Sequence, residues 1–73
     1  MKEKILIVES GAKTRSMLTD ILISEYYDVI QAKDAKECLK AIKKNELNLV
    51  LLNLNLPDMS GITTLKKIIV DKP

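Results

Sequence analysis

Short apolar runs alternate along this chain with longer segments whose apolar residues recur at helical spacing. Residues 5–8 and residues 49–52 are continuous aliphatic runs, which indicates strands covered on both faces. Residues 27–31 instead alternate between the two faces with polar side chains among them, which is typical of a strand at a sheet edge. The pattern therefore predicts three strands.

Two of the three predicted helices follow the first and the third strand. The first covers residues 13–25, with Ser10 or Thr14 as its N-cap. Its apolar stripe consists of Met17, Leu18, Ile21 and Leu22. The helix after the third strand begins beyond the turn of residues 57–61 and is capped by Ser60. Its stripe consists of Ile62, Leu65, Ile68 and Ile69.

The remaining helix is predicted between the second and third strands. Asp34 is its N-cap, and Glu37 stands three residues later at capping-box spacing. The helix closes near Asn45, after two lysines that favour the negative end of the helix dipole. Its buried stripe consists of Ala35, Cys38, Leu39 and Ile42.

The order β-α-β-α-β-α with short connections predicts an α/β fold built on a parallel sheet. Right-handed crossovers give the strand order 2-1-3, with the first helix on one face and the other two on the opposite face. In such a sheet the site lies beyond the carboxyl ends of the strands, where the strand order reverses. Glu9 and Ser10 after the first strand, and residues 53–55 after the third, are therefore the candidate site.

Composition narrows the functional classes. The 73 residues allow one small domain and contain no histidine, the commonest general base and metal ligand. Twelve basic and ten acidic residues give a net charge of +2, which does not favour nucleic-acid binding. Cys38 is the only cysteine, so an internal disulfide is excluded. Neither a signal peptide nor a membrane-spanning stretch is present, and we expect a cytoplasmic protein.

Two segments resemble the receiver domain of two-component response regulators. One is the first strand with the residue after it, Lys4-Ile-Leu-Ile-Val-Glu9, and the other is Leu56-Pro-Asp-Met-Ser-Gly61 after the third strand. The resemblance covers residues 1–73 but only about the first three-fifths of a receiver domain. It implies a three-layer, flavodoxin-like fold of which this chain holds the N-terminal β-α-β-α-β-α half.

The same resemblance defines a phospho-acceptor site that is degenerate here. In the family, an acidic pair after strand 1 and an aspartate ending strand 3 bind Mg²⁺, and that aspartate accepts a phosphoryl group from a histidine kinase. The matching positions are Glu9 and Ser10 for the pair and Asn53 for the acceptor. Asn55 matches a position that contacts the metal through its backbone carbonyl.

These replacements remove the groups needed for phosphoryl transfer and for tight Mg²⁺ binding. An amide is not a phosphoryl nucleophile, and one carboxylate in place of three holds Mg²⁺ weakly. We therefore expect no catalytic residue, no enzymatic activity and no cofactor. Glu9, Asn53 and Asn55 are only weak candidates for a Mg²⁺ site, and the simplest role of Glu9 is a hydrogen bond to Asn53.

The third strand would lie at an exposed edge of this half sheet. Apolar edges are templates for pairing with another chain. We therefore expect a homodimer in which this strand pairs with its symmetry mate, giving the strand order 2-1-3-3′-1′-2′. The edge is formed by Leu49, Val50, Leu51 and Leu52.

These features predict a receiver-like signalling module of a two-component system that is not phosphorylated and acts through protein contacts or self-association. A histidine kinase or another regulator is the expected partner class. Two alternatives stay open: the N-terminal fragment of a longer response regulator with a DNA-binding output domain, and a weak Mg²⁺-dependent phospho-acceptor.

Overall fold

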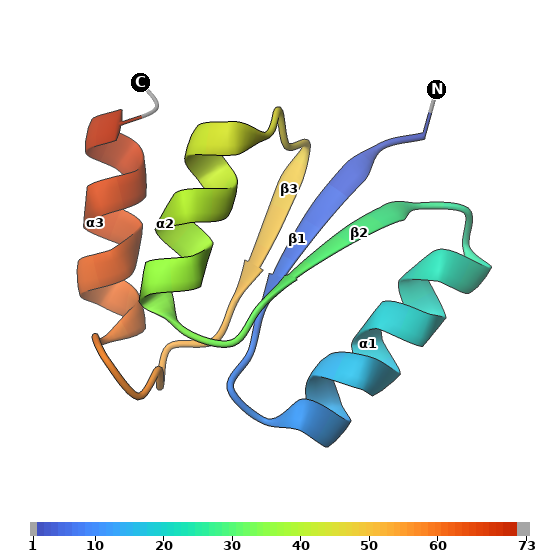
Figure 1. The fold of residues 1–73 in the computed structure, drawn as a ribbon, viewed down its shortest axis with the longest axis horizontal. Coiled ribbons are helices and arrows are strands. Elements are labelled where there is room, and N and C mark those ends of the chain that lie inside the picture. The colour runs from blue at the N-terminus through green and yellow to red at the C-terminus, as the bar shows by residue number, and fades with distance from the viewer. Residues whose placement is uncertain (1, 72–73) are drawn as a thin grey trace.

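Strands and helices alternate along residues 2–71, the part of the chain that the computed structural model describes (Figure 1). The elements are β1 (Lys4–Val8), α1 (Ala12–Ser24), β2 (Asp28–Ala32), α2 (Ala35–Lys44), β3 (Leu49–Leu52) and α3 (Gly61–Asp71). Each element differs from its predicted bounds by at most a residue or two, which is the usual uncertainty of element ends.

The three strands form one parallel sheet in the order β2-β1-β3. Ile5 of β1 lies opposite Val29 on one side and Leu49 on the other. Figure 1 shows α1 on one face of the sheet and α2 with α3 on the opposite face. The predicted strand order and the predicted placement of the helices are both confirmed.

The start of α1 differs from the prediction. Its N-cap is Gly11, and no side chain makes a capping hydrogen bond there. The Gly11 carbonyl accepts the Arg15 amide at 2.9 Å, while the Gly11 amide donates to Glu9 Oε2 at 2.7 Å. The predicted caps, Ser10 and Thr14, are therefore wrong, and the Glu9 carboxylate binds only the amide of the N-cap residue itself.

The caps predicted for the other two helices are confirmed. Asp34 Oδ1 accepts the Glu37 amide at 2.8 Å, and Glu37 Oε1 accepts the Lys33 amide at 2.9 Å. Ser60 Oγ accepts the Thr63 amide at 3.1 Å at the start of α3. In both helices the side chain of the residue just before the first turn thus accepts an amide of that turn.

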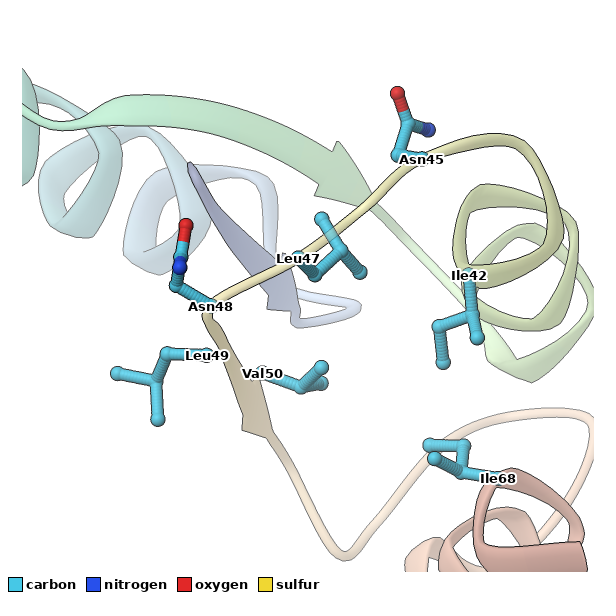
Figure 2. Close-up of a pocket in the computed structure, with 7 residues that line it drawn as sticks. All are labelled: Ile42, Asn45, Leu47, Asn48, Leu49, Val50 and Ile68. Carbon is cyan, nitrogen blue, oxygen red and sulfur yellow. The ribbon is translucent and has the colours of Figure 1, made fainter. Parts of the chain in front are cut away.

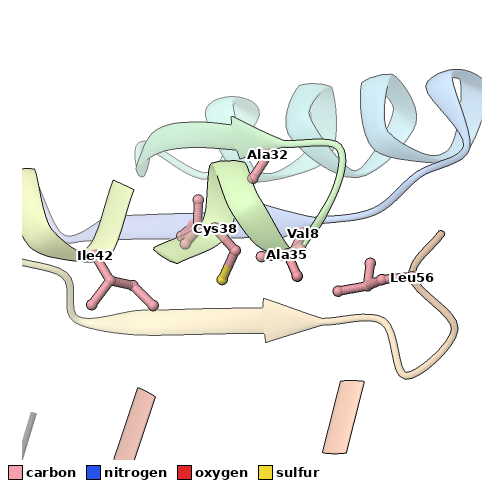
Figure 3. Packing of buried hydrophobic residues seen from close by; sticks show 7 residues of the cluster. Val8, Ala32, Ala35, Cys38, Ile42 and Leu56 are labelled. Carbon is pink, nitrogen blue, oxygen red and sulfur yellow. The ribbon is translucent and has the colours of Figure 1, made fainter. Parts of the chain in front are cut away.

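The main core lies between the sheet and α2 (Figure 3). Cys38 is fully buried and behaves as the small apolar residue expected from the sequence. The other buried members of this cluster are Leu6, Val8, Ala32, Ala35, Ile42 and Leu56.

The stripes of α1 and α3 are covered far less than that of α2. No residue of α1 is fully buried, and Met17 and Ile21 are more than half exposed. On α3 the side chain of Thr64 is buried, and its hydroxyl donates to the Ser60 carbonyl at 2.9 Å. Among the side chains of α3 that the structure describes, the large apolar ones that are exposed are Ile62, Leu65 and Ile69.

Candidate functional site

The candidate site lies where β1 and β3 end side by side. The Asn53 amide donates to the Val8 carbonyl at 3.0 Å, which continues the β1–β3 pairing by one residue. This backbone bond places Asn53 next to Glu9, 44 positions away in the sequence. The structure therefore brings together the two residues that the sequence assigned to one site.

Glu9 and Asn53 form a closed hydrogen-bond network. Asn53 Nδ2 donates to Glu9 Oε1 at 2.8 Å. The second carboxylate oxygen, Oε2, accepts the Gly11 amide, and Asn53 Oδ1 accepts the Asn55 amide at 2.9 Å. Each side-chain oxygen of the pair thus has a donor, and the hydrogen bond predicted for Glu9 is confirmed.

Ser10 and Asn55 do not join this pair through their side chains in the described structure. Both residues are exposed, and Asn55 contributes its backbone amide only. Arg15 holds the loop that carries Ser10, because its Nη1 donates to the Glu9 carbonyl at 2.8 Å and the Ser10 carbonyl at 3.4 Å. The sequence gave no signal for this positioning contact.

The loop after Asn53 folds back on itself and leaves no space at Gly61. The Gly61 amide donates to the Leu54 carbonyl at 2.8 Å, and Asn55 forms an isolated bridge with Ser60. A Cβ atom at position 61 would overlap Leu54 Cα and would lie 2.8 Å from the Asn53 carbonyl oxygen. Glycine is therefore required here for close backbone approach.

The far end of this loop is attached to α2 through Asp58. Its carboxylate accepts the Ala35 amide at 2.9 Å and the Lys36 amide at 3.1 Å. The bond from Ala35, with help from Lys36, lowers the pKa of Asp58 below its ordinary value. Sequence reasoning did not find this contact, because the two partners are 22 and 23 residues away from Asp58.

The residues present do not fit a Mg²⁺ site. Within residues 2–71, no three carboxylates, histidines or cysteines come close enough to share a metal ion. Magnesium prefers carboxylate oxygens, and both oxygens of Glu9 already accept hydrogen bonds. The arrangement supplies neither a carboxylate nucleophile at position 53 nor the charge that would hold the cation beside it.

None of the helices described is both long enough and apolar enough to cross a bilayer.

Comparison with known proteins gives a consistent result. Residues 5–73 match the model of the response regulator receiver domain. The chain is 35% identical over 69 residues to the chemotaxis protein CheY of Bacillus subtilis, covering 93% of this chain and 58% of that protein. It is 42% identical over 74 residues to a protein-glutamate methylesterase/protein-glutamine glutaminase of Methanococcus maripaludis, covering 99% of this chain and 20% of that protein.

A solved structure shows the same architecture. The CheY-like receiver domain protein of Methanospirillum hungatei superposes with a TM-score of 0.96 at 34% identity. The match covers all of this chain and 58% of that one. The chain thus spans less than two-thirds of the length of each of these three proteins. With the sheet order, the site position and the family model in agreement, the chain belongs to the response regulator receiver domain family.

Proposed function

We propose that this chain is a receiver-type module of two-component signalling that works through protein contacts without accepting a phosphoryl group. The observation that carries the proposal is the hydrogen bond from Asn53 Nδ2 to Glu9 Oε1 at 2.8 Å. It places an amide where an acceptor needs a carboxylate, and it occupies the one carboxylate that remains.

Acyl-phosphate formation requires a carboxylate oxygen to attack phosphorus. The amide nitrogen of Asn53 has no free lone pair for this attack, because that pair is delocalised into the carbonyl. The amide oxygen is uncharged and already accepts the Asn55 amide. With Ser10 in place of the second acidic residue, the site also lacks the negative charge that attracts Mg²⁺.

The test is incubation of the chain with acetyl phosphate and Mg²⁺, followed by intact-mass measurement. We expect no added phosphoryl group. The matched controls are Asn53→Asp, which restores the acceptor carboxylate, and Asn53→Asp with Ser10→Asp, which also restores the acidic pair. A gain of mass in the chain itself would show a weak phospho-acceptor and would contradict the proposal.

A second candidate is the N-terminal part of a longer response regulator with an output domain, such as a DNA-binding one. The coverage of 58% and 20% of two relatives favours it. The reading frame after the codon for Pro73 decides between the candidates. An open frame that encodes a further domain would replace the first proposal with this one.

The proposed partners are a histidine kinase or another regulator, met in the cytoplasm. The homodimer through β3 stays a prediction. Light scattering at micromolar concentration tests it, and a monodisperse monomer with cooperative unfolding would contradict it.

A further inference from the structure

The side of α2 that faces away from the core is rich in lysine. Its inner side is fixed by the buried residues Ala35, Cys38 and Ile42. Figure 2 shows Ile42 pointing toward the hollow that Val50 and Ile68 line. The exposed lysines of α2, which together we call the lysine face, are Lys36, Lys40, Lys43 and Lys44.

Helical spacing brings these like charges together. Lys40 stands four residues after Lys36 and four before Lys44, and residues at this spacing are neighbours on a helix. Like charges placed in this way destabilise the helix. The helix dipole favours Lys43 and Lys44 in the last turn but disfavours a cation such as Lys36 in the first turn. Helix stability therefore accounts for only part of the lysine face.

The carboxylates near α2 are held at its start. Asp34 accepts the Glu37 amide, and Glu37 accepts the Lys33 amide. Asp58 accepts two amides of the first turn, and the charge of Lys36 acts on its carboxylate. The exposed side of α2 is thus negative at its first turn and positive beyond it. The lysines of the positive part are Lys40, Lys43 and Lys44.

The chemistry of this face selects the class of partner. Single-stranded nucleic acid is usually bound by basic grooves with aromatic side chains on which bases stack. The two aromatic residues, Tyr26 and Tyr27, precede β2, and the net charge is only +2. A helix that lies on a membrane inserts its apolar face, whereas the apolar face of α2 is buried in the core. A peptide that carries carboxylates needs only the lysines.

We propose that the lysine face of α2 is a docking surface for an acidic peptide segment of another protein. Carboxylates at one end of the segment pair with Lys40, Lys43 and Lys44, and its uncharged end lies over the carboxylates at the first turn of α2. The proposal rests on the proposed function only in that both involve a protein contact. It does not involve Asn53, so the two proposals fail in different experiments.

The probe is a synthetic peptide with a run of glutamates followed by serines and glycines. Its matched control has glutamines in place of the glutamates. Backbone amide signals of the chain are followed by NMR during titration. The glutamate peptide should give saturable shifts centred on residues 40–44, and the glutamine peptide should give none. Added salt should weaken the binding, because it screens exposed charges.

Two matched variants locate the contact. Lys40→Gln and Lys13→Gln each remove one exposed lysine from a helix and lower the net charge equally. Lys40→Gln should raise the Kd of the glutamate peptide about twofold to fivefold, whereas Lys13→Gln should leave it unchanged. Because Lys40→Gln relieves like-charge repulsion, its urea midpoint should not fall. A lower midpoint would assign Lys40 a structural role and overturn the proposal.

The proposal is also overturned if the glutamate peptide causes no saturable shifts on α2. Equal weakening by Lys13→Gln and Lys40→Gln has the same consequence, because the contact then depends on net charge alone. A single-stranded oligonucleotide and vesicles containing phosphatidylserine are titrated in parallel. If either binds at the lysine face and the glutamate peptide does not, the partner is a nucleic acid or a membrane and the proposal is wrong.

Discussion

The side-chain amide of Asn53 lies beside the carboxylate of Glu9. Asn53 keeps the position beside Glu9 and fills it with a donor, so the pair attract each other without a metal ion. Two carboxylates at this distance would repel each other unless a cation or a proton lay between them. At the residue scale, the hydrogen bond from Asn53 to Glu9 therefore joins the ends of β3 and β1.

Gly61 is the residue whose replacement should disturb this site most. In Gly61→Ala the new methyl group would meet backbone atoms of Asn53 and Leu54 within 3 Å, and neither can move without moving the loop. We expect the free energy of unfolding to fall by about 1–3 kcal/mol, as for other overpacked positions. Urea denaturation followed by circular dichroism measures it.

Gly11→Ala is the matched control for that experiment. Its nearest neighbour would be Glu9 Oε2 at 3.2 Å, the end of a side chain that can adjust. Its φ of −73° is allowed for alanine. This variant should lose clearly less stability than Gly61→Ala, and equal losses would refute the close-approach argument.

At the scale of elements, two carboxylates share the N-terminus of α2. Asp34 caps it from the adjacent residue, and Asp58 reaches it from the loop before α3. Both carboxylates lie where the helix dipole favours negative charge. The loop that follows Asn53 is thus attached to a helix on the far side of the core, which links the candidate site to α2.

This link predicts a pH dependence. The pKa of Asp58 is lowered in the folded chain, so its contribution is present above its ordinary pKa of 3.8 and is lost as the pH falls through the lower folded value. We expect Asp58→Asn to lower the urea midpoint at neutral pH. The difference from the natural chain should shrink in strong acid. A difference that stays constant from neutral to strongly acidic pH would contradict this role.

At this scale the sequence could predict features set by local patterns and by chain topology, but not side-chain contacts between separate segments. The elements, the 2-1-3 order, the Asp34 and Ser60 caps and the nearness of Glu9 to Asn53 come from local patterns and crossover handedness. The hydrogen bonds of Asp58 to α2 and of Arg15 to the Glu9 carbonyl could not be predicted, because they depend on how separate segments pack together. The cap of α1 was predicted wrongly, because the N-cap residue is Gly11, which has no side chain to accept an amide of the first turn.

At the scale of the whole molecule, burial is uneven. The core between the sheet and α2 is closed around Cys38, whereas α1 has no fully buried residue and β3 is half uncovered. Packing of an amphipathic face supplies most helix stability in proteins. We therefore expect the α2 side of the sheet to be the last part of the chain to open, and α1 to open earlier.

Cys38 can measure this opening. It is fully buried, and burial raises its pKa to about 11 from the ordinary 9.0. Iodoacetamide at mildly alkaline pH should therefore modify the native chain much more slowly than the urea-unfolded chain, because only the exposed thiolate reacts. Between pH 9.0 and about 11 the unfolded thiol ionises while the folded one does not, so stability should fall with rising pH. Cys38→Ala lacks this loss and separates it from lysine titration in the same range. Native modification as fast as in urea would show that this core opens as readily as the periphery.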